Sequence, residues 1–224
     1  MSRTSGRPST VADGPGRPEV AEIGRRLRDA RVQQSIGLRE LGRRLSVSAS
    51  MISQIETGRV MPSVSTLYAI TSELGVSLDE LFARQPADAR PDAAPDTEPG
   101  SRVDTDLIQH AVSRTRLGLG SGVHWERLTV VPDADIDFLY CTYDVGSESA
   151  PPELLQRHGG HEYGFVEQGR LGVTVGFETY ELAAGDSISF SSSIPHRLFN
   201  LLDDRPSTAV WFVIGRSGDE RTGS

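Results

Sequence analysis

The sequence contains no lysine, so all 23 of its cationic side chains are arginines. It has one cysteine, Cys141, which excludes an intrachain disulfide and gives no sign of an oxidising compartment. No run of about 18 apolar residues occurs, which argues against a membrane-spanning helix. The first twenty residues also lack the apolar segment of a signal peptide. We therefore expect a cytoplasmic protein with no membrane partner.

The charge of the chain is unevenly distributed. The net charge is −8, which by itself would argue against a nucleic-acid partner. However, residues 17–84 carry ten arginines against eight acidic residues, whereas residues 103–224 carry nine against eighteen. Because nucleic-acid binding depends on local charge, the first third of the chain is the part suited to DNA.

Composition and periodicity divide the chain into an α part and a β part in separate domains. Residues 85–102 combine proline, alanine, aspartate and glycine without apolar periodicity and are predicted to be a linker. Apolar residues recur at helical spacing before the linker and at strand spacing after it. The predicted division is a disordered arm, a helical domain, the linker, a β domain and a tail, at residues 1–17, 18–84, 85–102, 103–216 and 217–224.

Five helices are predicted before the linker, at about residues 18–33, 38–45, 49–58, 63–74 and 78–82. Ser48 can cap the third of these helices, and Gly58 can take the left-handed conformation that ends it.

The residues from Leu38 to Phe82 resemble the helix-turn-helix of the xenobiotic-response-element family, which includes the lambda-type phage repressors. The matching positions are Leu41, Leu45, Val47, Ile52, Ile55, Glu56, Gly58, Pro62, Leu67, Leu74, Gly75, Leu81 and Phe82. The resemblance implies a five-helix, lambda-repressor-like domain that binds DNA. The chain departs from the family at Gly37 and Leu38, where many members carry a capping threonine and a phosphate-contacting glutamine.

A DNA-contacting surface follows from the helix after Ser48. If Ile52 and Ile55 face the interior, the opposite side points outward and can enter the major groove. The residues predicted to contact bases or nearby phosphates are Ser48, Ala49, Ser50, Ser53 and Gln54. The residues predicted to contact phosphates are Arg39, Arg43, Arg44 and Arg59. The alternative is that these residues form an ordinary solvated or protein-contacting surface.

The β part resembles a cupin, a double-stranded β-helix barrel of the jelly-roll type. Two segments carry the resemblance, residues 156–169 and 185–200, with turn glycines and Pro195-His196 at the expected places. Trp125, Tyr140, Tyr163, Phe165, Phe190 and Trp211 are expected to line the pocket or the core of such a barrel.

The cupin resemblance also implies a metal site. The metal-binding positions correspond to Gln156, His158, Glu162 and His196, so the first histidine of the family pattern is absent. Two histidines and a carboxylate, with Gln156 as a weak fourth ligand, suit Fe, Mn, Ni or Zn. The alternative is a pocket for an organic effector without metal, in which His196 holds a strand entrance by hydrogen bonds and Glu162 pairs with an arginine such as Arg197.

Together the two resemblances indicate a helix-turn-helix/cupin transcriptional regulator. We expect a homodimer, because one recognition helix reads few base pairs and paired half-sites on a palindromic operator lie about 34 Å apart. We expect a small-molecule effector or metal in the cupin domain. The alternative is an iron enzyme of the hydroxypropylphosphonate-epoxidase type, with His158, Glu162 and His196 as ligands. The lack of lysine and the outward serines and glutamine argue against that enzyme.

Overall fold

The computed structural model describes residues 17–78, 81, 107–131, 133 and 135–215. The predicted arm, linker and tail fall almost wholly outside these ranges. Of the predicted fifth helix, only Leu78 and Leu81 are described, and both side chains are buried. Among the described residues, no helix combines the length and the apolar character that crossing a bilayer requires.

The helical region, residues 17–81, contains four complete helices close to the predicted positions. They are α1 (Arg17–Gln33), α2 (Leu38–Leu45), α3 (Ala49–Glu56) and α4 (Val64–Leu74). The Ser48 hydroxyl accepts a hydrogen bond from the Met51 amide at 3.0 Å, which is the predicted cap of α3. The helix ends two residues before Gly58, which has a left-handed φ of 66°. Local capping signals thus define both ends of α3.

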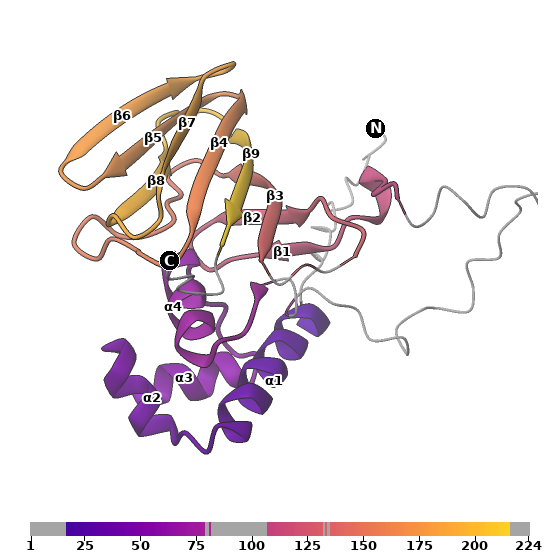
Figure 1. The fold of residues 1–224 in the computed structure, drawn as a ribbon, viewed down its shortest axis with the longest axis vertical. Helices are drawn as coiled ribbons and strands as arrows, with labels where there is room; N and C mark the ends of the chain where they lie inside the picture. The colour runs from indigo at the N-terminus through magenta and orange to yellow at the C-terminus, as the bar shows by residue number, and fades with distance from the viewer. Residues whose placement is uncertain (1–16, 79–80, 82–106, 132, 134, 216–224) are drawn as a thin grey trace, which may run out of the picture.

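The β region, residues 107–215, includes a short 3₁₀ turn (Ala111–Ser113) before the first strand and consists of two antiparallel sheets. The strands are β1 (Arg116–Gly118), β2 (Val123–Arg127), β3 (Ile136–Tyr143), β4 (His161–Gln168), β5 (Arg170–Val175), β6 (Glu178–Ala183), β7 (Ser187–Ser191), β8 (His196–Asn200) and β9 (Ser207–Ile214). Six strands form one sheet in the order β1-β2-β3-β9-β4-β7, and β6-β5-β8 form the other. The two sheets lie together above the helices (Figure 1).

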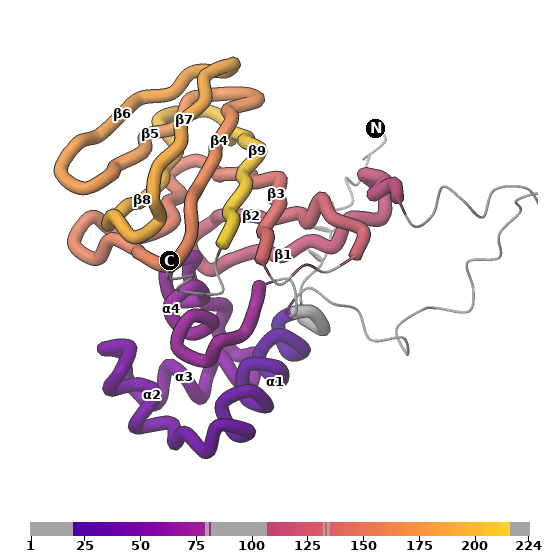
Figure 2. The backbone as a smooth tube through the Cα atoms, viewed as in Figure 1, coloured from indigo at the N-terminus to yellow at the C-terminus, as the bar shows by residue number. Residues whose placement is uncertain are grey.

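Helix α4 joins the two regions. In the backbone trace it lies directly beneath the sheets, with α2 and α3 farther from them (Figure 2). The buried apolar side chains of both regions form one continuous core, in which Leu67 and Tyr68 of α4 belong to the same cluster as Trp125 and Leu139 of the sheet. The sequence predicts two domains, but it does not predict this shared core.

Alternation along β4 decides which side chains point inward. Glu162 and Val166 are buried, whereas Tyr163 and Phe165 are about 45% exposed. The expectation that Tyr163 and Phe165 line the pocket or the core is therefore wrong, because successive residues of a strand point to opposite faces. Trp125, Phe190 and Trp211 are buried, as expected.

Candidate functional site

Helix α3 presents the polar surface that the sequence predicts. Ile52 and Ile55 are 1% and 2% exposed and face the core. On the other side Ser50 and Gln54 are exposed, Ala49 and Ser53 are half-buried, and Ser48 is exposed while its oxygen caps the helix. Met51 is also exposed on this helix. Sequence reasoning missed it, because an apolar methionine next to the buried Ile52 resembles a core residue.

The four predicted phosphate-contacting arginines, Arg39, Arg43, Arg44 and Arg59, are all exposed. Glu40 pairs with Arg43 at 2.7 Å and with Arg44 at 2.8 Å, and Arg44 also reaches Glu73. These arginines lower the pKa of Glu40 to about 2. Ion pairs between exposed side chains are weak, so the guanidinium groups of Arg43 and Arg44 can exchange Glu40 for a phosphate.

The orientation of α3 is fixed from behind by α1. Arg31 and Glu56 form a buried bidentate pair, with 2.6 Å from Nε to Oε1 and 2.8 Å from Nη2 to Oε2. The Glu56 carboxylate raises the pKa of Arg31, and Arg31 also donates to the Ile36 carbonyl. Gly42 of α2 allows close packing as well, since a Cβ there would lie 2.7 Å from the Val47 carbonyl oxygen.

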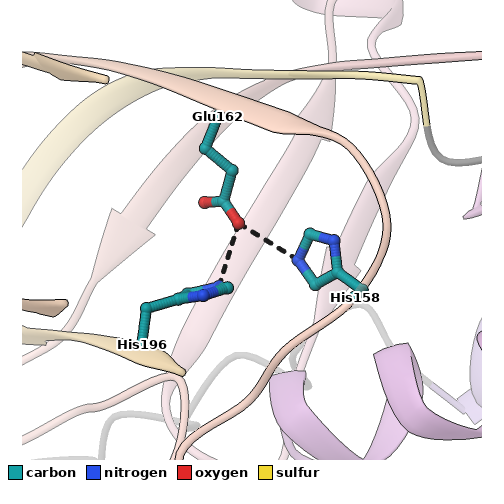
Figure 3. A group of neighbouring side chains, drawn as sticks. All are labelled: His158, Glu162 and His196. Atoms are coloured by element: carbon teal, nitrogen blue, oxygen red, sulfur yellow. Dashed lines mark ion pairs between the residues drawn. The ribbon is translucent and has the colours of Figure 1, made fainter. Parts of the chain in front are cut away.

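A second site lies inside the β region, where His158, Glu162 and His196 converge (Figure 3). Glu162 Oε1 lies 3.1 Å from His158 Nε2 and 2.9 Å from His196 Nε2. All three residues are buried, and their ligand atoms lie within 4.8 Å of one another. Glu162 comes from β4, His196 from the start of β8, and His158 from the loop before β4.

Neighbouring groups orient each of the three side chains. His158 Nδ1 lies 2.9 Å from the Gly159 carbonyl and His196 Nδ1 lies 2.8 Å from the Ile194 carbonyl. A ring that donates its Nδ1 proton to a carbonyl keeps a bare lone pair on Nε2. Trp211 Nε1 donates to Glu162 Oε2 at 2.7 Å, which leaves Oε1 for the site. Trp211 fits because its ring lies over Gly164, where a Cβ would be 2.1 Å from the ring.

The converging atoms have no hydrogen-bond partner among the described residues. They are His158 Nε2, Glu162 Oε1, His196 Nε2 and Gln156 Oε1. The two Nε2–Oε1 separations are short, but neither contact is a hydrogen bond. Burial raises the pKa of Glu162, yet the attraction of the two imidazoles outweighs it and lowers that pKa. Burial lowers the pKa of His196, and Glu162 raises it by more. The carboxylate is therefore charged.

This donor set fits a divalent transition metal. Two imidazole nitrogens and one carboxylate oxygen, each held by an outer hydrogen bond, are the ligands and supports that such ions require, and a metal would replace any proton on the imidazole Nε2 atoms. Gln156 lies beside the triad, because its backbone forms a bridge with His196 and its side chain lines the same cavity as Glu162. A bound ion there would act as a Lewis acid with coordination positions left for a small molecule.

The structure contradicts the alternative role of Glu162 and partly supports the alternative role of His196. Arg197 pairs with Glu148 at 2.7 Å, so it does not neutralise Glu162. His196 does hydrogen-bond at a strand entrance, but through Nδ1 alone. Strand alternation does not explain why His158 points inward. The strand starts at His161, after Gly160 with φ of 106°, and the His158 backbone amide donates a hydrogen bond to the Ser192 carbonyl at 3.1 Å.

The cavity above the triad is small and closed by α4. Its walls are Val64, Tyr68, Trp125, Leu139, Cys141, Tyr143, Gln156, Glu162, Leu198 and Trp211, and its volume is about 20 Å³. That is room for one water molecule. Burial, and secondarily the charge of Glu162, raises the pKa of the Cys141 thiol. The sequence predicts Trp211 in the pocket or the core, but it does not predict the hydrogen bond to Glu162 or the presence of Tyr68, which no local pattern marks.

Comparison with known proteins agrees with both parts of the chain. Residues 27–81 match the helix-turn-helix family and residues 139–213 match the cupin domain family. The HTH-type transcriptional regulator PuuR of Escherichia coli (strain K12) is 30% identical over 178 residues, which cover 79% of this chain and 86% of PuuR. The PuuR of Shigella flexneri matches equally well.

Solved structures show a similar fold. A crystal structure of an HTH_3 family transcriptional regulator from Vibrio cholerae has a TM-score of 0.60 at 20% identity, over 88% of this chain and 97% of that one. Hydroxypropylphosphonic acid epoxidase from S. wedmorenis has a TM-score of 0.40 at 18% identity, over 87% and 98%. This second likeness is too weak to carry an argument. The helix-turn-helix region, the cupin domain and the extent of the match with PuuR show that the chain belongs to the family of HTH-type transcriptional regulators with a cupin domain.

Proposed function

We propose that this regulator binds a palindromic operator in double-stranded DNA through the outer side of α3, and that its cupin domain holds a divalent metal and receives a small-molecule effector. One observation carries the DNA part: Ile52 and Ile55 are buried while Ser50 and Gln54 on the opposite side are exposed. In this proposal the helices form a five-helix lambda-repressor-like domain, the two sheets form a jelly-roll barrel, and the protein acts in the cytoplasm.

The proposed contacts divide by role. Gln54 can pair bidentately with adenine, Ser50 and Ser53 can bond to bases or phosphate, and Ala49 can touch a thymine methyl. Ser48 uses its oxygen as the α3 cap and keeps its hydroxyl hydrogen for a phosphate. The phosphate contacts fall to Arg39, Arg43, Arg44 and Arg59, which set the register of the helix on the duplex.

Replacing Gln54 by alanine tests the base contacts. We expect Gln54→Ala to lose preference at one base position by about 1–3 kcal/mol, because a bidentate contact disappears. The measurement is selection from a random duplex library, followed by competition titrations of the selected and altered sequences.

Arg43→Ala is the matched control on the neighbouring helix. It should weaken binding to all duplexes alike and reduce the slope of affinity against salt by about one unit. If Gln54→Ala keeps the wild-type base preference, the proposed contact of α3 with the bases is wrong. If the wild-type protein does not distinguish any duplex from random competitor, the whole DNA proposal fails.

The metal proposal is supported by the four buried donor atoms that lack hydrogen-bond partners and by the outer hydrogen bonds that orient them. The proposed ligands are His158, Glu162 and His196, with Gln156 as a weak fourth, and the proposed ions are Fe, Mn, Ni or Zn. We propose a sensory site and no catalysis, because the relatives that match most of this chain are named as regulators.

We propose that the outer face of the β3-β9-β4 sheet joins two copies of the chain into the dimer that a palindrome requires. Phe138 and Phe212 form an edge-on ring pair at 5.6 Å, and Tyr163 lies next to Phe212. A groove of about 400 Å³ continues this surface and is lined by uncharged residues only: Tyr163, Gly164, Phe165, Ser187, Ile188, Ser189, Val210 and Phe212. In a domain with twice as many acidic as basic residues, an uncharged groove is where two copies meet with the least repulsion.

Placing a charge on this face should separate the dimer. We expect Phe165→Asp to sediment as a monomer, because each copy would bury an unpaired carboxylate in the interface. Phe177→Asp is the matched control, since Phe177 is fully exposed on the turn between β5 and β6, and it should sediment like the wild type. A dimer of unchanged strength in Phe165→Asp would assign the contact to another surface.

A further inference from the structure

Helix α4 is buried on two sides. Leu67, Ile70 and Leu74 recur at helical spacing and belong to the core of the helical region. Val64 and Tyr68, four residues apart and hence on one face, are 2% and 5% exposed and line the cavity of the cupin domain. The same helix thus supports the DNA-binding fold and closes the ligand cavity.

Tyr68 makes the contact with the metal site. Its ring stacks on the ring of His158 with centroids 4.3 Å apart and planes 5° apart. It also meets Trp125 edge-on at 5.6 Å. His158 is a proposed metal ligand, so a side chain of the DNA-binding domain lies directly against the coordination sphere.

Backbone contacts hold α4 in this position. The Gly120 amide donates to the Pro62 carbonyl at 3.0 Å, and the Ser65 amide donates to the Ser149 carbonyl at 3.0 Å. Gly120 permits the approach because it has no side chain: a Cβ there would lie 2.4 Å from the Met61 carbonyl oxygen. The interface therefore depends on a glycine that touches neither the triad nor α3.

We infer that α4 is the lid of the effector cavity and that Tyr68 couples the contents of that cavity to the position of the DNA-binding helices. With α4 in place the cavity measures about 20 Å³, enough for a water beside an ion but not for an organic molecule. An organic effector reaches the triad only when Val64 and Tyr68 withdraw. Because α4 packs against α1 and α2, its displacement moves the DNA-binding helices with it.

This inference rests on the proposed function and adds a mechanism to it. Ligand control requires that a ligand bind one arrangement of the protein better than another. Here the two arrangements are α4 docked over a nearly filled cavity and α4 displaced from an open one. The effector and the lid compete for the same space, which supplies the difference in affinity.

The test uses Cys141, which lines the cavity, as a built-in probe of entry by a small organic molecule, iodoacetamide. In Gly120→Ala we expect alkylation of Cys141 to be at least about tenfold faster than in the wild type, because the lid opens more often. Hydrogen exchange at the Ser65 and Gly120 amides should accelerate in parallel. Metal content should stay at the wild-type level, because all four donors come from the cupin domain. Gly118→Ala is the matched control, since its added methyl meets only the exposed ring of His124, at 3.3 Å.

A second pair of variants tests Tyr68 itself. Tyr68→Ala should increase alkylation as Gly120→Ala does, whereas Tyr68→Phe, which keeps the stacked ring, should alkylate within about twofold of the wild type. Gly120→Ala should also change the affinity for the selected duplex by at least about fivefold, in either direction, while Gly118→Ala does not.

The outcomes separate this inference from the proposed function. Unchanged alkylation in both Gly120→Ala and Tyr68→Ala would overturn the lid while leaving sequence-specific DNA binding and metal content intact. Faster alkylation with unchanged DNA affinity would overturn the coupling through Tyr68. Loss of all duplex preference in the wild-type protein would overturn the proposed function, yet the alkylation and exchange results would still support the lid.

Discussion

Glu162→Gln is expected to bind no divalent metal, although it keeps the size of the side chain. The amide oxygen can still accept from Trp211 Nε1, which now donates to Glu162 Oε2 at 2.7 Å. That arrangement turns the amide nitrogen toward His158 Nε2 and His196 Nε2, the atoms that Oε1 approaches at 3.1 and 2.9 Å. An NH₂ group donates protons and offers no lone pair, so the site loses its anionic ligand and gains a blocking donor.

Two measurements check this expectation. Elemental analysis of protein purified without chelator should find metal in the wild type and only background in Glu162→Gln. Metal supplied at a hundred times its dissociation constant should stabilise the wild type by about 2.7 kcal/mol, a rise in Tm of roughly 5–10 °C for a chain of this size. Glu162→Gln should show no rise.

Glu167→Gln is the matched control on the same strand. Its carboxylate is exposed and accepts from Thr208 at 3.2 Å on the outer face, so metal content and thermal shift should remain those of the wild type. Equal metal content in the two variants, or a wild type that takes up no metal, would remove the metal from the proposed function.

Glu56→Ala is expected to lower the free energy of unfolding by about 3–5 kcal/mol, because it leaves the Arg31 guanidinium buried without its counterion. The side chains of the pair are 10% and 6% exposed and joined by two hydrogen bonds. Since the pair connects α1 to the last residue of α3, the loss should weaken DNA binding together with stability. Denaturation followed by helical circular dichroism measures the change.

Two further variants interpret this result. Glu181→Ala breaks the exposed pair with Arg170 on the sheet and should change the unfolding free energy by no more than about 1 kcal/mol. The double variant Arg31→Leu/Glu56→Leu should recover most of the stability, because apolar side chains of similar volume need no partner. A loss for Glu56→Ala as small as that for Glu181→Ala would show that the pair is not a stabilising link.

Local features of the chain could be predicted from the sequence, and long-range ones could not. The bounds of α2 follow from the helical spacing of Leu38, Leu41 and Leu45, and the cap of α3 follows from the Ser48 side chain. The triad is what the resemblance to the cupin motifs implies. The outward position of Tyr163 and Phe165 depends on strand register, where a shift of one residue exchanges the two faces. The contact of Tyr68 with His158 spans 90 residues of sequence and arises only when α4 meets the β region.

The placement of Trp125 and Trp211 gives the protein an optical property. These are its only two tryptophans, and both line the wall of the small cavity. Almost all of the fluorescence excited at long ultraviolet wavelengths therefore originates within a few ångströms of the triad. Unlabelled protein should consequently report events at that wall through the intensity and colour of its own emission, without a dye and without any change to the sequence.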